Sequence, residues 1–114
     1  MNPQPVTDIF IRTYSADLPW LSYCLRSIQK YCTGFRDIVI VIPRSQKHLL
    51  DGFNLTHEKV FACDEYTDDY LGQQITKIHA TDYSDAPYIL FTDSDTLFVK
   101  ETKPSDFMID GKPV

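Results

Sequence analysis

The amino-acid sequence predicts an α/β fold, with a Rossmann-like and mostly parallel sheet flanked by helices. Apolar runs rich in Ile, Val and Phe alternate with segments of helical periodicity along the whole chain, and this alternation is typical of such sheets with right-handed crossovers. The 114 residues are 43% hydrophobic and 24% charged, which is enough for one core but not for two. We therefore expect a single domain over residues 1–114.

The first half of the chain contains two predicted strands with a helix between them. Asp8 to Thr13 is a short apolar run that favours a buried strand. From Leu18 to Cys32 the apolar residues recur at helical spacing, with Gly34 just beyond the end. Trp20 is expected to anchor this helix. Asp37 to Ile42 is an uninterrupted β-branched run, typical of a strand covered on both faces.

The second half repeats the alternation. Ser45 to Leu50 is expected to form a short helix and Glu58 to Cys63 a third strand. An acidic loop leads into a predicted helix from Tyr70 to Asp82, and Tyr88 to Thr92 follows as the fourth strand. The predicted helix has one apolar face, formed by Leu71, Ile75 and Ile78.

Ligands of open parallel sheets bind beyond the carboxyl ends of the strands. Four segments occupy that position: Thr13 to Asp17, Pro43 to Gln46, Cys63 to Tyr66 and Asp93 to Thr96. We expect the function of the protein to reside in these segments.

Composition excludes several classes of function. The net charge is −5 and no stretch concentrates Lys and Arg, so binding to nucleic acid or to an anionic membrane is not expected. No apolar run approaches the ~20 residues of a membrane helix, and the first residues lack the layout of a signal peptide. The three cysteines have no metal-ligand spacing. We expect a cytoplasmic protein with free thiols.

The string Asp93-Ser94-Asp95 directly follows the fourth predicted strand. Because side chains two residues apart on a strand point the same way, the two carboxylates are expected to converge. Like charges that close are unfavourable unless a hard divalent cation lies between them, and Mg²⁺ or Mn²⁺ would serve. The alternative interpretation is a solvated acidic turn, because a D-x-D string alone is a weak motif.

In its context, the stretch YILFTDSDTLFV resembles the D-x-D segment of GT-A glycosyltransferases. Residues 73–77, followed by Ala80, are similar to the helix that precedes that segment in the family. The opening Thr13-Tyr14 with Asp17 is similar to the family's first strand, loop and helix, and residues 107–114 resemble the segment after the motif in bacterial and phage members. The chain would then be the N-terminal, donor-binding half of such an enzyme.

The resemblance implies roles for particular residues. Asp93 and Asp95 would bind Mn²⁺ or Mg²⁺ and, through it, the diphosphate of a nucleotide-diphospho-sugar, with Asp95 the firmer ligand. Thr13 and Tyr14 would contact the base or ribose. Asp17 would accept a hydrogen bond there, although a helix N-cap is an equal alternative.

Gln74 and Lys77 lie about one turn apart on one flank of their helix and would also bind the donor. Lys77 would reach the sugar or a phosphate as a point charge, and a solvated surface lysine is the alternative. The implied activity is transfer of the sugar to an acceptor that the sequence does not identify.

Two other functions remain open. The family places its acceptor site downstream of the motif, and this chain ends 19 residues after Asp95, so a non-catalytic nucleotide-sugar-binding remnant is one alternative. A haloacid-dehalogenase-type phosphotransferase is another, but that family requires D-x-D-G-T or D-x-D-x-T/V near the start of its domain. We also expect self-association, as a homo-oligomer, through the sheet edge or through residues 96–114.

Overall fold

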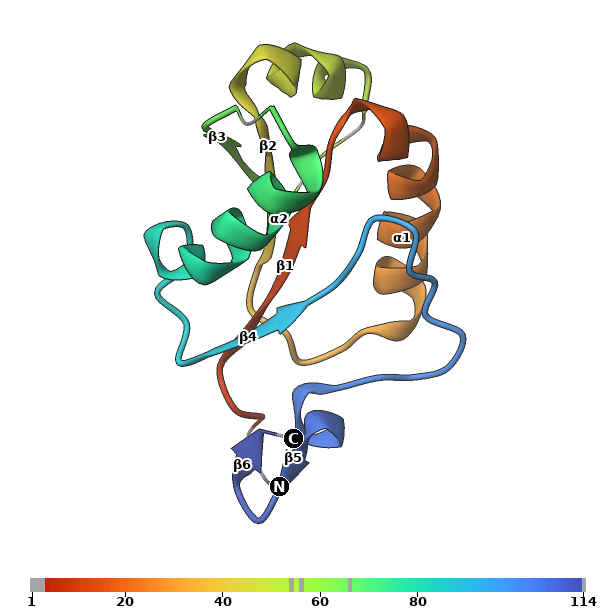
Figure 1. Cartoon of the computed structure of the whole chain (residues 1–114). Helices are drawn as coiled ribbons and strands as arrows, with labels where there is room; N and C mark the ends of the chain where they lie inside the picture. Colours follow the sequence, from red (N-terminus) through yellow and green to blue (C-terminus); the bar gives the residue numbers. More distant parts are fainter. Residues whose placement is uncertain (1–3, 54, 56, 66, 114) are drawn as a thin grey trace.

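The computed structural model describes residues 4–53, 55, 57–65 and 67–113 and confirms the predicted fold class (Figure 1). Its main sheet is parallel, with the strand order β3-β2-β1-β4. The strands are β1 (Thr7–Arg12), β2 (Ile38–Pro43), β3 (Lys59–Cys63) and β4 (Tyr88–Phe91). Parallel pairing places the carboxyl ends of all four strands at one edge of the sheet.

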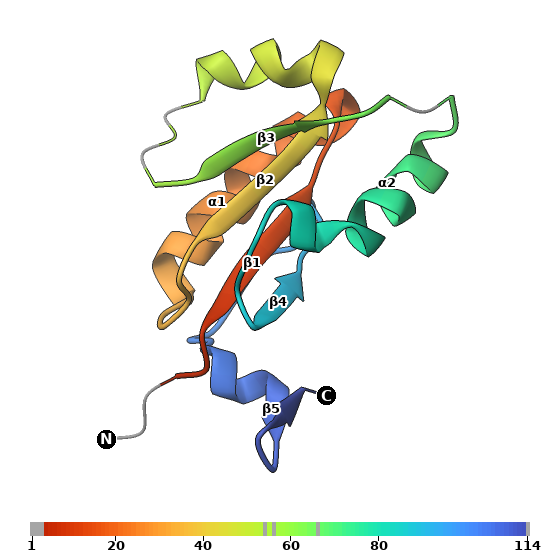
Figure 2. The same cartoon turned by 90° about the vertical axis from the view of Figure 1, so that its left-hand side faces the viewer.

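Two α-helices cover opposite faces of this sheet (Figure 2). They are α1 (Leu18–Tyr31), between β1 and β2, and α2 (Asp69–Ile78), between β3 and β4. The remaining elements are the 3-10 helices η1 (Ser15–Asp17), η2 (Arg44–Gly52), η3 (Ala80–Asp82) and η4 (Pro104–Phe107), and a small hairpin of β5 (Met108–Ile109) and β6 (Lys112–Pro113). None of the helices among the described residues has the length and apolar character needed to cross a membrane.

The core consists of two apolar clusters, one on each face of the sheet. Alternate residues of β1 supply both: Ile9 and Ile11 pack toward α1, whereas Phe10 packs toward the opposite face. The cluster on the α1 face also contains Leu21, Cys24, Leu25, Ile28, Ile40, Ile42 and Leu50. The smaller cluster contains Val39, Val41, Cys63 and Ala80. Both faces of the sheet are therefore apolar, as the β-branched strand sequences predict.

The predicted apolar face of α2 is wrong. Leu71 is 53% exposed and Ile78 is 78% exposed, whereas Gly72 and Thr76 are buried. The Thr76 hydroxyl donates a hydrogen bond to the Gly72 carbonyl at 2.8 Å, which satisfies it inside the helix. Small side chains thus face the molecule, whereas Leu71 and Ile78 project away from it and Ile75 is half-buried. The helix also ends at Ile78, and the last residues predicted for it form η3.

The chain after β4 crosses to the side of α1 and follows that helix (Figure 1). The Phe98 N–H donates to the Ser27 hydroxyl at 3.0 Å. Further along, the Thr102 N–H donates to the Tyr31 carbonyl at 2.8 Å. These bonds fix the segment that begins with Asp93 against α1.

Candidate functional site

The topological switch point of the sheet lies between β1 and β4. From β1 the chain crosses to β2 on one side, and it arrives at β4 from β3 by way of α2 on the other face. The Thr92 N–H donates to the Phe10 carbonyl at 2.9 Å, so the two strands stay paired up to the start of the acidic motif. A crevice beyond this point is where open α/β sheets bind ligands.

Side chains tie together the loops at this carboxyl edge. The Gln46 side-chain oxygen accepts a hydrogen bond from the Ser15 N–H at 2.7 Å, which links the loops after β2 and β1. The Glu65 carboxylate accepts one from the Ser45 N–H, also at 2.7 Å. The loops after β1, β2 and β3 therefore support one another. Tyr66, at the end of the third segment that the sequence singles out, lies outside the described residues.

Asp93 and Asp95 are both exposed, and Ser94 between them is buried. We expected the two carboxylates to point the same way because they would be two residues apart on a strand. That reason is wrong, because β4 ends at Phe91 and the motif lies beyond the strand. Instead the Thr96 N–H donates to the Asp93 carbonyl at 3.0 Å and closes a turn. A turn presents its polar side chains to solvent, which leaves both carboxylates accessible to a ligand.

The two carboxylates have different surroundings. Asp93, whose side chain is 69% exposed, has its Oδ1 3.5 Å from Nζ of Lys77 on α2. Asp95 instead borders a hollow of about 640 Å³ beside α1, lined also by Trp20, Tyr23 and Leu97. Lys77 is thus drawn to the motif, so it is not simply a solvated surface lysine.

Cys24 of α1 lies directly beneath the motif. Its thiol donates a hydrogen bond to the Asp93 carbonyl, with a sulfur–oxygen distance of 3.7 Å. Burial raises the pKa of Cys24 to about 12, with smaller contributions from the neighbouring Cys32 thiol and from the charges of Asp95 and Asp93. A thiol with its pKa raised this far is protonated at neutral pH.

The acidic turn has the right donor atoms for a hard divalent cation. Asp93 and Asp95 supply carboxylate oxygens, which Mg²⁺ and Mn²⁺ prefer. Within the part of the chain that is described, no group of three or more His, Cys, Asp or Glu residues is placed to hold a metal ion. Two carboxylates suit an ion whose other ligands are water and substrate phosphates, which is how Mg²⁺ is usually held.

The predicted nucleotide-binding residues follow β1. Thr13 is fully buried, and its hydroxyl has no hydrogen-bond partner among the described residues. Tyr14 is half-buried, has an extended backbone, and precedes η1. Asp17 occupies the N-cap position of α1, but within the described residues its side chain accepts no capping hydrogen bond. Of these three residues, Thr13 is thus placed to support the loop, and Tyr14 and Asp17 remain accessible.

Gln74 is exposed on α2, one turn before Lys77. Because Lys77 lies beside Asp93, this flank of α2 borders the motif. The structure thus places Lys77 beside Asp93, whereas no hydrogen bond or ion pair between described residues links Gln74 to the motif.

Sequence reasoning missed two aromatic side chains beside the motif. Trp20 is 57% exposed and Tyr23 is 54% exposed, so the expectation that Trp20 anchors α1 is wrong. The apolar part of the buried stripe of α1 consists of Leu21, Cys24, Leu25 and Ile28. These four residues form the whole apolar face of the helix without either aromatic residue. This spacing is the sequence signal that would have placed Trp20 and Tyr23 outside the core.

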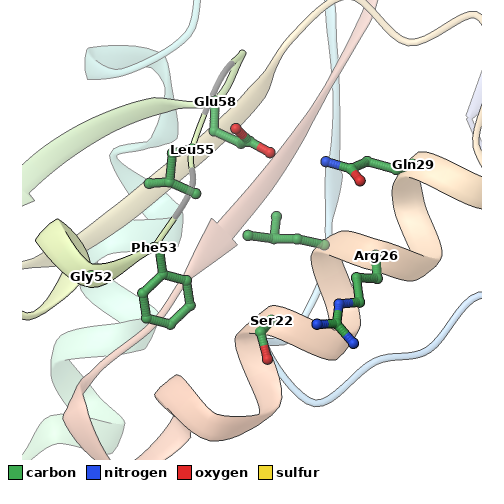
Figure 3. A pocket seen from close by; sticks show the side chains of 8 residues that line it. Ser22, Arg26, Gln29, Gly52, Phe53, Leu55 and Glu58 are labelled. Atoms are coloured by element: carbon green, nitrogen blue, oxygen red, sulfur yellow. The ribbon is translucent and has the colours of Figure 1, made fainter.

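Another hollow, of about 370 Å³, lies between α1 and the residues Gly52, Phe53, Leu55 and Glu58 (Figure 3). Arg26 and Glu58 lie on opposite walls, and Leu25, Phe53 and Leu55 provide its apolar part. These apolar residues belong to the core cluster or pack against it. This hollow is therefore a gap at the edge of the core, and none of the predicted site residues lines it.

A comparison of the chain with models of known protein families gives no match, and neither does a comparison with characterised proteins. The residues at the carboxyl edge of the sheet are therefore the basis for assigning a function.

Proposed function

We propose that this chain is the donor-binding half of a GT-A-type glycosyltransferase. It binds a nucleotide-diphospho-sugar through Mn²⁺ or Mg²⁺ held by Asp93 and Asp95. The observation that carries the proposal is the position of these two exposed carboxylates, in a tight turn at the switch point between β1 and β4. A carboxylate pair at that point has the chemistry to bind a diphosphate by way of a cation and has no evident role in stability.

The metal ion, when bound, neutralises the diphosphate and stabilises it as a leaving group. Asp95 is the principal ligand in this proposal, since the charge of Asp93 is shared with Lys77 at 3.5 Å. Lys77 serves as a second positive charge near the phosphates. The Ser94 side chain is buried beneath the turn, which fixes the two carboxylates relative to the sheet.

The nucleoside lies along the loop after β1. Tyr14 offers a half-buried aromatic ring to the base or ribose, and Asp17 offers a carboxylate to a ribose hydroxyl. Gln46 holds this loop in place through the Ser15 N–H. Gln74 contacts the donor from the flank of α2 in the same proposal.

The acceptor and the transfer step complete the proposed activity. Three free thiols, Cys24, Cys32 and Cys63, agree with a reducing compartment, and we place the protein in the cytoplasm. Phe91 on β4 is an exposed apolar side chain at the open edge of the sheet, and Leu97 and Val99 are exposed on the segment that follows the strand. A further protein surface covers this edge in the proposal, either in an oligomer or in the acceptor-binding part of the enzyme.

Isothermal titration calorimetry of UDP and of GDP tests the proposal. With Mn²⁺ present, at least one of the two nucleotides should bind saturably. In chelator the affinity should fall at least about tenfold, because carboxylate repulsion of the diphosphate is then uncompensated. Equal affinity with and without metal, or no binding of either nucleotide, contradicts the proposal.

A further inference from the structure

The hollow beside Asp95 has an aromatic wall. Trp20 and Tyr23 are three residues apart on α1 and therefore lie on the same side of the helix. Both are more than half exposed, and Leu97 on the segment after the motif is 57% exposed as well. Together with Asp95 these side chains line about 640 Å³ of space.

This aromatic exposure is not explained by packing. Single exposed apolar residues are ordinary, but three together beside a carboxylate form a patch of the kind that marks a binding site. Arg26 lies over the Tyr23 ring, 6.0 Å from its centroid. That contact occupies one face of Tyr23, whereas Trp20 has no ring or cation contact of this kind among the described residues. The indole of Trp20 is therefore the main aromatic surface that a ligand can contact in this hollow.

We propose that this hollow binds a sugar ring. One face of a pyranose is a row of C–H groups that packs flat on an aromatic side chain, and its rim carries hydroxyl groups that donate hydrogen bonds. Trp20 and Leu97 provide the apolar surface, and the Asp95 carboxylate accepts from the hydroxyls. The inference deepens the proposed function and rests on it for the source of the sugar, which is either the donor or the acceptor.

The charge of the hollow favours a neutral saccharide over other occupants. Its lining contains one carboxylate and no Lys or Arg, so an anionic group is repelled unless a cation is bound first. A polypeptide suits the outer edge of β4 better, on the side away from β1, where a groove of about 460 Å³ is lined mainly by apolar residues. An amphipathic ring with hydroxyls fits the hollow beside Asp95.

Trp20 provides a direct readout, because it is the only tryptophan in the chain. In ¹⁵N-labelled protein its indole N–H gives one identifiable signal. The probes are the methyl glycosides of glucose, galactose, mannose and N-acetylglucosamine, and UDP-glucose, UDP-galactose, UDP-N-acetylglucosamine and GDP-mannose, each nucleotide sugar with Mg²⁺ and compared with its free nucleotide. We expect the indole signal to shift saturably with at least one saccharide-bearing probe, and more than with the matching free nucleotide.

Two variants show whether the aromatic wall is responsible. Trp20→Ala should weaken binding of the responding probe about tenfold, as measured by saturation transfer to its C–H protons or by calorimetry. Tyr70→Ala is the matched control, because Tyr70 is an aromatic residue that is 72% exposed on α2, and it should change nothing. Both substituted side chains are mostly exposed, so both variants should keep the wild-type urea midpoint.

The outcomes separate this inference from the proposed function. If Trp20→Ala weakens a nucleotide sugar but not its free nucleotide, the donor's sugar occupies the hollow; if it weakens only a methyl glycoside, the acceptor's sugar does. Saccharide binding that depends on Trp20 in a protein that binds no nucleotide supports the sugar site and refutes the proposed function. The inference is overturned if no probe depends on Trp20. It is also overturned if the indole signal shifts with protein concentration alone, because another copy of the chain then covers the hollow.

Discussion

The two ends of the parallel sheet differ in whether their buried polar groups have hydrogen-bond partners. At the amino end, Asp8 is 1% exposed and fully engaged: its carboxylate accepts from Arg36 at 2.9 and 2.8 Å, from the Ser84 hydroxyl at 2.6 Å and from the Asp37 N–H at 3.1 Å. At the carboxyl end, the buried hydroxyls of Thr13 and Ser94 have no partner within the described part of the chain.

This difference separates stability from binding. A buried carboxylate with every acceptor position used costs little and joins three segments of chain, since Arg36, Asp37 and Ser84 precede β2 and β4. Unpartnered buried hydroxyls reduce stability, and they persist where a ligand makes use of the site. The amino end thus holds the sheet together, and the carboxyl end is where chemistry is expected.

The largest expected effect is on stability, from Asp8→Ala. The substitution removes the shared acceptor of Arg36, Ser84 and the Asp37 N–H, and should lower the free energy of unfolding by about 3 kcal/mol. This value lies at the lower end of the range for removing one partner of a buried ion pair, because the Arg36 side chain is 37% exposed and water can solvate it. Urea denaturation measures the change.

Asp85→Asn is the matched control for that prediction. Asp85 also accepts a hydrogen bond from Arg36, at 2.7 Å, but its side chain is 90% exposed. The change in the free energy of unfolding should be much smaller than that of Asp8→Ala, because water screens an exposed ion pair. Equal effects of the two substitutions would show that burial of Asp8 is not what gives the amino end its strength.

The same substitution at two buried serines should give effects of opposite sign. Ser84→Ala removes a hydrogen bond to a carboxylate and should lower the free energy of unfolding by about 2 kcal/mol. Ser94→Ala removes a buried hydroxyl that has no partner among the described residues, and should raise the free energy of unfolding by up to about 1 kcal/mol. Thermal or urea unfolding of both variants decides this, and a loss of stability in Ser94→Ala would contradict the contrast between the two ends.

Asp95→Asn should affect binding but not folding. It keeps the size of the side chain and removes the charge that a hard cation requires, so metal-dependent nucleotide affinity should fall at least about tenfold. Stability should be unchanged or higher by a few tenths of a kcal/mol, because a like charge near Asp93 is relieved. Asp51→Asn, an exposed change on η2 with the same loss of charge, should bind nucleotide normally in calorimetry.

The smallest expected effect is the acid response of the amino end. Burial raises the pKa of Asp8, but hydrogen bonds from Arg36, Ser84 and the Asp37 N–H lower it by more, so it lies below the ordinary value of 3.8. A carboxylate with a lowered pKa stabilises the folded state above its unfolded pKa and loses that contribution as the pH falls through the folded pKa. The urea concentration at the unfolding midpoint should therefore decrease as the pH is lowered below about 4, and this decrease should be smaller in Asp8→Ala.

Local pattern was sufficient to predict most of the fold. The β-branched run of β2 and the periodic stripe of α1 are strong signals, and the structure has both elements within one residue of the expected bounds. The buried face of α2 was not predictable in this way. Gly72 and Thr76 face the molecule because they are small, not because they are apolar. Local pattern cannot show which small residues a neighbouring layer will accept.

The candidate site was predictable only in part. The string Asp93-Ser94-Asp95 and its position after a strand are visible in the sequence. The bond from the Ser15 N–H to Gln46 spans 31 residues, and the proximity of Lys77 to Asp93 depends on how α2 packs. Contacts of this kind come from tertiary structure, which no short motif contains.

The most direct test of the central proposal is a Mn²⁺ titration of ¹⁵N-labelled protein with UDP or GDP present. Bound Mn²⁺ broadens the signals of nearby amides, so it reports where the cation lies. Broadening should begin at Asp93, Asp95 and Tyr14, while the amides of Arg36 and Ser84 at the opposite end of the sheet stay sharp. Broadening centred elsewhere, or no selective broadening at all, would contradict the assignment of the carboxyl end as a metal and diphosphate site.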